Sequence, residues 1–500
     1  MTGLWSLIVL LIGTINANRV SWVEPLPGAR TEPLRPIMRA DEFGPESPYR
    51  ILLSLADLPE AYDVVEVDGW LQKLSKHPCP RTPPVAPVQG SPWDAKTCAR
   101  MRQVLRDAKR ELELARRIAV MPDARVPTHL DPAAPLDEAP GLVRGLRHIL
   151  ILSAYQKEGE GDYAGAFAEL TTFLRLASML TRGGSTIHQM SSWPITAIAV
   201  SSIYKIASRN HVQADVLKRT AGDILEARSV PDPPSEGVRN ELPYLLRQHN
   251  AYLDPRFVGR AVGASYARGY CLGRLASILL AGGTPADSRN NLTAYVGQFA
   301  DLGDAPYRPE GVRRLRSFVK PLQFDTYACL DPFAFTTALH HPFGFPQSPL
   351  SRTPTWDVFV PYLVYRDPYG LAMASDHLKY FPRYLRDHAE TIALLRGTAL
   401  FLAVKAYEND TGRPPARLAD LVPRYLAAVP KDPFDGKPFR YVVGEVPKLW
   451  GDVTWGLYSI ASDFRDDGGK ADTVVSAHRR YSRQGMRKNP DIIWIPKPLP

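Results

Sequence analysis

Apolar residues recur with the 3.6-residue period of an α-helix through much of this 500-residue chain. The clearest case is a pair of such patterns, at 142–155 and 163–180, which are separated by the polar break 158–162. A break this short lets two helices fold back on each other as an antiparallel hairpin. Each helix of a hairpin must bury an apolar face against another helix. The pattern therefore predicts a mainly α-helical protein, built as a helical bundle or as irregular helical hairpins.

Other segments carry the same helical pattern. They are residues 101–118, 195–208, 212–227, a stretch that begins near Glu241, 260–280, and a long segment from about 376 to 408. The hairpin at 142–180 resembles one tetratricopeptide-like unit, but no pattern repeats at a fixed period, which argues against a regular repeat array. The content of 45% hydrophobic and 23% charged residues is that of a globular chain. At about 150 residues per unit, its length suggests two to four structural units.

Shifts in composition divide the chain into five parts. Residues 1–18 are a signal peptide or short membrane anchor, and residues 19–95 are a Pro-rich spacer with a short helical segment. An α-helical domain follows at 96–281. Residues 282–375 are rich in Pro, Gly and aromatic side chains and predict an irregular connector. Residues 376–500 combine the last long helix with a small α+β module.

The amino-terminal part carries an apolar run at 4–17 that ends at the small residue Ala17. A membrane-spanning helix needs about 20 residues, so the run fits an export signal better. No Lys or Arg precedes it, which leaves two alternatives open: an uncleaved short anchor, and a buried helix of a cytoplasmic protein. We expect an exported protein of the periplasm or cell envelope, either free or anchored in the inner membrane through this segment.

The charge and the motif content restrict the class of function. The net charge of +9 is spread along the chain, without a basic run interleaved with aromatic residues, so we expect no nucleic-acid binding. There is no Gly-x-Ser-x-Gly elbow, no phosphate-binding loop and no His-Glu-x-x-His motif. These observations favour a non-enzymatic binding or scaffold protein with an unidentified protein partner. The alternative is an exported hydrolase with its site in the irregular region 282–361, where loops carry functional groups without a sequence signature.

The four cysteines are too few for a disulfide-rich scaffold. Cys79 and Cys98 flank a Pro-rich loop, and they pair only if the compartment is oxidising, which the sequence leaves open. Cys271 and Cys329 stand alone in apolar surroundings. No Cys-x-x-Cys occurs, so zinc-ribbon and thioredoxin-like sites are excluded.

The end of the chain carries β-strand signals. Residues 438–443, 454–460 and 492–495 are prone to form strands and are bounded by turn residues. Pro433 and Gly436 suit a tight turn before the first strand. The pattern predicts a small antiparallel sheet packed on the preceding long helix.

From Ala399 onward the chain resembles the soluble part of the type II secretion major pseudopilins. The shared features, in chain order, are a helix, Gly412 and Pro414, a Leu-rich short segment, Asp432-Pro433 with Gly436 and Tyr441, a turn from Ser459 to Asp463 followed by Gly468-Gly469, and Asp491-Ile492. The resemblance covers a minor part of the chain and implies a pseudopilin-like α+β module.

The chain also departs from that family. Phe434 stands where the family has Trp, one extra residue precedes Gly468, and the amino-terminal apolar run lacks the family's Glu and lies far from the module. We therefore do not expect this chain to polymerise as a pilus subunit. As a whole it resembles uncharacterised exported envelope proteins of planctomycete-like bacteria, which implies no activity.

In pseudopilins the equivalent acidic turn binds calcium. The resemblance implies that Asp463, Asp466 and Asp467 supply carboxylate ligands to a calcium ion, with Gly468 and Gly469 letting the backbone turn inward. The alternative is a plain turn with solvated charges, because Asp and Gly are common turn formers.

Overall fold

The computed structural model describes residues 39–56, 62–77, 93–128, 138–251, 253–254, 256, 278, 284–304, 307–313, 381–469 and 491–496. Several expected features lie outside these residues. They are the segment 1–18, Cys79, Cys271, Cys329, nearly all of the helix expected at 260–280, and most of the connector 282–375. Cys98 is buried in a helix, but its pairing with Cys79 stays a prediction.

The described part of the chain is mainly helical, which confirms the predicted class. Its longer α-helices are α3 (Val64–Leu74), α4 (Ala95–Asp107), α5 (Lys109–Val120), α6 (Ala139–Glu160), α7 (Tyr163–Met179), α8 (Thr186–Arg209), α9 (Ala214–Leu225), α10 (Pro234–Ala251), α13 (Pro285–Asp304) and α19 (Phe381–Thr411), and the short α2 (Pro48–Leu53) precedes them. None of the helices in these described ranges combines the length and apolar character needed to cross a membrane.

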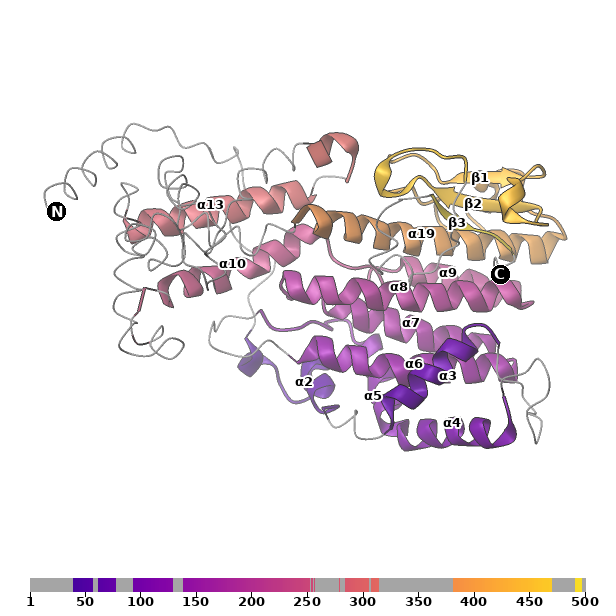
Figure 1. Cartoon of the computed structure of the whole chain (residues 1–500), viewed down its shortest axis with the longest axis horizontal. Coiled ribbons are helices and arrows are strands. Elements are labelled where there is room, and N and C mark those ends of the chain that lie inside the picture. The colour runs from indigo at the N-terminus through magenta and orange to yellow at the C-terminus, as the bar shows by residue number, and fades with distance from the viewer. Residues whose placement is uncertain are drawn as a thin grey trace, which may run out of the picture.

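The predicted hairpin is formed by α6 and α7, and its break consists of helix-ending and helix-starting residues. Gly161 ends α6 with a φ of 81°, in the left-handed region that glycine adopts without steric cost. Asp162 then starts α7, because its side chain accepts a hydrogen bond from the backbone N–H of Gly165 at 2.9 Å. Helices α8 and α9 pack on α7 in turn, so the hairpin becomes the middle of a layered bundle (Figure 1).

The long helix α19 belongs to the bundle as well as to the carboxy-terminal sheet. It packs along α8 and α9, where Lys405 Nζ donates a hydrogen bond to the carbonyl of Ala207 at 2.7 Å, and Asn409 Nδ2 to that of Val212 at 2.7 Å. The sheet lies on another side of the same helix (Figure 1). One hydrophobic core runs from Phe43 in the first described segment to Trp494 in the last strand. Bundle and sheet therefore share a core.

The predicted sheet is confirmed. Its strands are β1 (Arg440–Val443), β2 (Trp455–Ser459) and β3 (Ile492–Trp494), in the order β1-β2-β3 with both pairs antiparallel. A turn precedes β1, in which the Gly436 N–H donates to the carbonyl of Asp432 at 2.9 Å and Gly436 has a φ of 73°. Gly436 therefore occupies the position expected for a tight turn.

The two faces of this sheet have different neighbours. Leu457 pairs with both Tyr441 and Trp494, and this face packs on α19, where the Trp494 ring lies against Gly397. Because side chains alternate along a strand, Arg440 and its direct partner Tyr458 lie on the other face. That outer face supports the acidic turn.

The structure corrects the expected organisation at 285–304. These residues were expected to be irregular, yet they form α13, which packs beside α10 (Figure 1). The buried face of α13 includes Ser288, Gly297, Gln298 and Gly303 besides its apolar residues. Such small and polar residues weaken the hydrophobic periodicity from which a helix is predicted.

The described parts of the expected spacer 19–95 also pack onto the bundle. Leu52 of α2, Val67 of α3 and Trp93 are buried and belong to the main hydrophobic core. Apolar contacts with the bundle therefore hold these described parts in place, because burying such side chains stabilises by about 1.5–3 kcal/mol each.

Replacing Gly397 by alanine is expected to destabilise the protein, although alanine normally favours a helix. A Cβ at this position would lie 2.3 Å from two carbons of the buried Trp494 ring, and overpacking of this kind costs about 1–3 kcal/mol. The matched control is Gly222 of α9, which has nothing within 4 Å of an added Cβ. Gly222→Ala should stabilise by up to about 1 kcal/mol. Urea unfolding of both variants measures the difference, and equal stability would contradict the close packing at Gly397.

Candidate functional site

The acidic turn 463–469 follows β2 and lies over the outer face of the sheet. Phe464, Gly468 and Gly469 have φ values of 61°, 70° and 71°, so the chain bends sharply at both ends of the turn. Two aspartates stabilise the bend locally. Asp463 Oδ1 accepts a hydrogen bond from the Arg465 N–H at 3.0 Å, and Asp466 Oδ1 accepts one from the Gly468 N–H at 3.1 Å.

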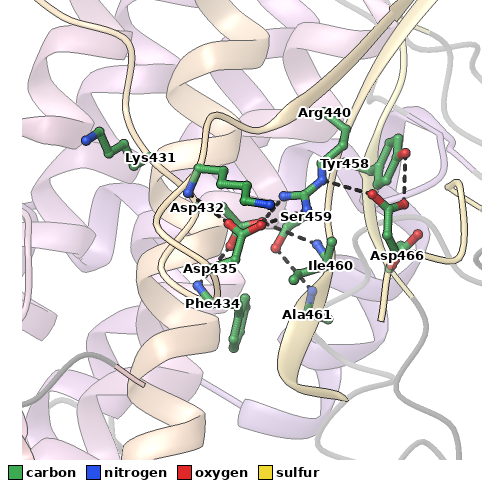
Figure 2. A network of polar contacts seen from close by, with 12 residues as sticks. Lys431, Asp432, Phe434, Asp435, Arg440, Tyr458, Ser459, Ile460, Ala461 and Asp466 are labelled. Atoms are coloured by element: carbon green, nitrogen blue, oxygen red, sulfur yellow. Dashed lines mark hydrogen bonds and ion pairs between the residues drawn. The ribbon is translucent and has the colours of Figure 1, made fainter. Parts of the chain in front are cut away.

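Arg440 of β1 lies among three carboxylates, two from the turn before β1 and one from the acidic turn (Figure 2). Its Nη2 donates to Asp435 Oδ2 at 2.7 Å, its Nε donates to Asp466 Oδ2 at 3.1 Å, and its Nη1 lies 3.6 Å from Asp432 Oδ2. Tyr458, directly opposite Arg440 on β2, also donates to Asp466, at 3.1 Å. The arginine therefore ties the turn before β1 to the acidic turn after β2.

Asp432 is the buried member of this network. It is 0% exposed, and its carboxylate accepts hydrogen bonds from the N–H groups of Phe434 at 3.1 Å and Ile460 at 3.3 Å. Burial raises the pKa of Asp432 above its ordinary value despite these bonds. For Asp466 burial also acts to raise the pKa, but hydrogen bonds from Gly468 and Arg440 outweigh it and lower the pKa. Asp432 is thus a structural carboxylate, and Asp466 stays ionised.

The far end of the turn is fixed through Gly469. The Trp450 indole N–H donates to the Gly469 carbonyl at 2.7 Å, and the Gly469 N–H donates to Asp491 Oδ2 at 2.8 Å. A Cβ at position 469 would lie 2.5 Å from the Trp450 ring. Only glycine satisfies both this close approach and the positive φ.

Asp491, which binds the end of the turn from a position just before β3, has unusual surroundings for a carboxylate. Its residue is 1% exposed, and its Oδ1 has no hydrogen-bond partner among the residues that the structure describes. Burial, together with the negative charges of Asp467, Asp466 and Asp463, raises the pKa of Asp491 to about 6. A buried carboxylate with one unsatisfied oxygen beside three other acids is strongly disfavoured in its charged form.

The structure places the three predicted ligands on one turn, but in different surroundings. Asp463 is half-buried, Asp466 is bound by Arg440 and Tyr458, and Asp467 is exposed. All three act electrostatically on Asp491. Within the described residues, no three or more His, Cys, Asp or Glu side chains stand in a set that could hold a metal ion. The oxygen donors suit calcium in kind, and binding requires the carboxylates to move towards a common point.

Sequence reasoning did not assign roles to Arg440 and Asp491. Arg440 follows a turn in an ordinary strand, and only the strand register places it beside Tyr458 and Asp466. Asp491 was visible as part of the Asp491-Ile492 pair, but its burial depends on how β3 joins the sheet.

Comparison of the chain with protein-family models, with curated proteins and with solved structures finds no match.

Proposed function

We propose that this is an exported, non-enzymatic envelope protein whose helical body serves as a binding or scaffold platform for a protein partner. Its carboxy-terminal part is a pseudopilin-like module that calcium stabilises at the acidic turn. The amino-terminal segment 1–18 provides export and, if uncleaved, attachment to the inner membrane. The observation that carries the proposal is the buried carboxylate of Asp491, which lies beside three further aspartates and has one oxygen without a hydrogen bond from the described part of the chain.

A bound cation would stabilise the negative charge of Asp491, which burial and the neighbouring aspartates disfavour. At neutral pH the carboxylate of Asp491 loses its proton against both burial and the charge of its neighbours. Among the described cations, Arg440 is engaged by Asp435 and Asp466, and it has no contact with Asp491 in the structure. Calcium takes six to eight oxygen ligands, and it would draw on Asp491 Oδ1, on the turn carboxylates and on water.

The same reasoning supports a location outside the cytosol. Calcium sites built from few, imperfectly gathered ligands bind with dissociation constants of about 10⁻⁴ to 10⁻³ M, as in extracellular modules. Such a site fills only where calcium is abundant. An acidic turn of this kind is therefore useful to an exported protein.

Calcium is expected to stabilise the protein, and the effect should depend on Asp491. At ten times the dissociation constant, one bound ion adds about 1.4 kcal/mol to the free energy of unfolding. The raised pKa fixes the pH dependence. The contribution of Asp491 to the free energy of unfolding is fully present below pH 3.8, the ordinary pKa of the side chain. It is lost as the pH rises through about 6, the pKa of Asp491 in the folded protein. The calcium effect should therefore grow between pH 5 and pH 7, as the proton leaves. Urea unfolding with calcium and with chelator measures it.

Asp491→Asn supplies the matched test. Without calcium at pH 8 the variant should be more stable than the wild type by ~2 kcal/mol, because the buried charge is gone while the bond from Gly469 is kept. It should gain nothing from calcium. Asp452→Asn, at an exposed aspartate between β1 and β2, should behave as the wild type. Equal responses to magnesium and calcium, or a full calcium response in Asp491→Asn, would remove the ion from the proposal.

Export is tested separately by cell fractionation and amino-terminal sequencing of the expressed protein. Recovery from the envelope or periplasm, with or without residues 1–18, supports the proposal. Recovery from the cytosol with an intact amino terminus contradicts it.

A further inference from the structure

A pocket of 230 Å³ opens between α3, α6 and α8. Helix α3 lies across α6 at this point (Figure 1). Each helix contributes residues three or four positions apart, the spacing that places side chains on one face. The pocket shares no residue with the acidic turn, so it is a separate site.

One part of the wall is apolar. Leu71, Ile151 and Ile198 come from the three different helices, and the buried Tyr155 lies beside them. An apolar wall of this kind binds a hydrocarbon chain or ring, because each buried CH₂ contributes about 0.8 kcal/mol. The volume is slightly below the range of about 300–1,000 Å³ typical of ligand pockets. The ligand should therefore be smaller than a typical drug molecule.

The charged groups of the pocket do not balance. Asp68 and Arg147 form an ion pair at 3.0 Å, so they largely cancel. Lys205 also lines the pocket, and its ammonium forms no hydrogen bond or ion pair with any described residue. The remaining charge is therefore a single positive one, placed at the wall.

No carboxylate of the described residues forms an ion pair with Lys205. Burial lowers the pKa of Lys205, and the charges of Arg209 and Lys76 lower it further. Asp68, which lines the same pocket, is held by Arg147. Glu158 of α6 is held by Arg209, whose Nε donates to it at 2.7 Å. Arg209 also occupies the carbonyls at the end of α3, donating to Ser75 at 3.1 Å and to Leu74 at 3.2 Å. Neither these two acids nor these carbonyls are left to compensate the ammonium.

We propose that this pocket binds a small amphiphilic monocarboxylate, with the carboxylate at Lys205 and the apolar body against Leu71, Ile151 and Ile198. A single ammonium favours a singly charged head group over a phosphate, for which arginine forks are better suited. The hydroxyls of Ser201 and Ser202 on α8 lie on the same wall and provide further polar groups near the head group.

Octanoate is the probe that tests the proposal, with octanol and octyl phosphate as matched analogues. Binding to the full chain is measured by titration calorimetry and by ligand-observed NMR. Octanoate should bind at least tenfold more tightly than octanol. Lys205→Met should lower the affinity for octanoate by about tenfold and leave the affinity for octanol unchanged. Lys205→Arg should keep most of the affinity for octanoate. Lys96→Met, at an exposed lysine of α4, is the control and should bind as the wild type.

Three other results would contradict the proposed binding of a monocarboxylate at Lys205. Equal affinities for octanoate and octanol would show that the ammonium is not used. Tighter binding of octyl phosphate than of octanoate would show that the pocket prefers a phosphate head group, and this would overturn the assignment. Unchanged octanoate affinity in Lys205→Met would place the ligand elsewhere. The thermal midpoint of Lys205→Met should not fall, because the variant removes an unpaired, half-buried charge, so a loss of binding would not report unfolding. The calcium experiment involves other residues, so either proposal can fail alone.

Discussion

Replacing Arg209 with methionine is expected to lower the free energy of unfolding by about 3–5 kcal/mol. Glu158, whose side chain is 1% exposed, would then keep its charge in the core without a cation. Arg209 binds it with two nitrogens and stacks over the Tyr155 ring at 5.6 Å. The backbone carbonyls of Leu74 and Ser75 would lose their donors as well. Urea unfolding followed by circular dichroism measures the loss.

Two further variants separate the charge from the packing. Arg209→Lys keeps the positive charge, but a lysine cannot contact Glu158 through two nitrogens and also reach the carbonyls at the end of α3. Its loss in free energy of unfolding should therefore lie between zero and that of Arg209→Met. The double variant Glu158→Gln with Arg209→Met should recover part of the stability, because no buried charge is left unpaired. A loss in Arg209→Met below about 1 kcal/mol, or a double variant with the summed loss of the two single ones, would contradict this account.

Replacing Trp494 with alanine is expected to cost about 3–5 kcal/mol. The side chain is 0% exposed, its ring packs against Gly397 of α19, and its indole N–H donates to Thr398 Oγ1 at 3.0 Å. Phe439, which directly precedes β1, meets the same ring edge-to-face, with centroids 5.8 Å apart. The substitution therefore opens a cavity at the contact between sheet and helix.

The form of the unfolding curve is a second readout of Trp494→Ala. Because the core runs from α2 to β3 without a break, we expect one cooperative transition that moves as a whole. Trp494→Phe should lower the free energy of unfolding by less than Trp494→Ala does, because most of the ring volume stays. It removes the hydrogen bond to Thr398 and only a small part of the packing. A separate early transition of the carboxy-terminal module, with the helical bundle unaffected, would mean that the module folds independently of α8 and α9.

Much of the secondary structure follows from the sequence because its signals are local. The glycine and aspartate at 161 and 162 end one helix and start the next, whatever lies around them. The three strands lie within their predicted ranges, because β-prone residues and turn formers alternate over short distances there. Helix α13 was missed for the converse reason. Its buried face contains glycine, serine and glutamine, which pack well against α10 but give a weak periodic pattern.

The candidate site was predictable only in part. The position of the acidic turn could be read from its Asp and Gly residues. Its electrostatics could not, since they depend on Arg440, which lies 26 residues before Asp466, and on Asp491, whose N–H donor Gly469 lies 22 residues before it. The pocket at Lys205 was not predicted either, because its wall is shared by three helices.

The sequence alone determined which segments become helices, strands and turns, since short-range backbone preferences and side-chain periodicity control those choices. The tertiary structure decided that α19 packs against both the bundle and the sheet, and that Asp491 is buried. It also decided that, among the described residues, Asp491 Oδ1 has no hydrogen-bond partner and Lys205 has no acidic one. Burial and charge balance arise only when distant segments are brought together, and they set the chemistry of both proposed sites.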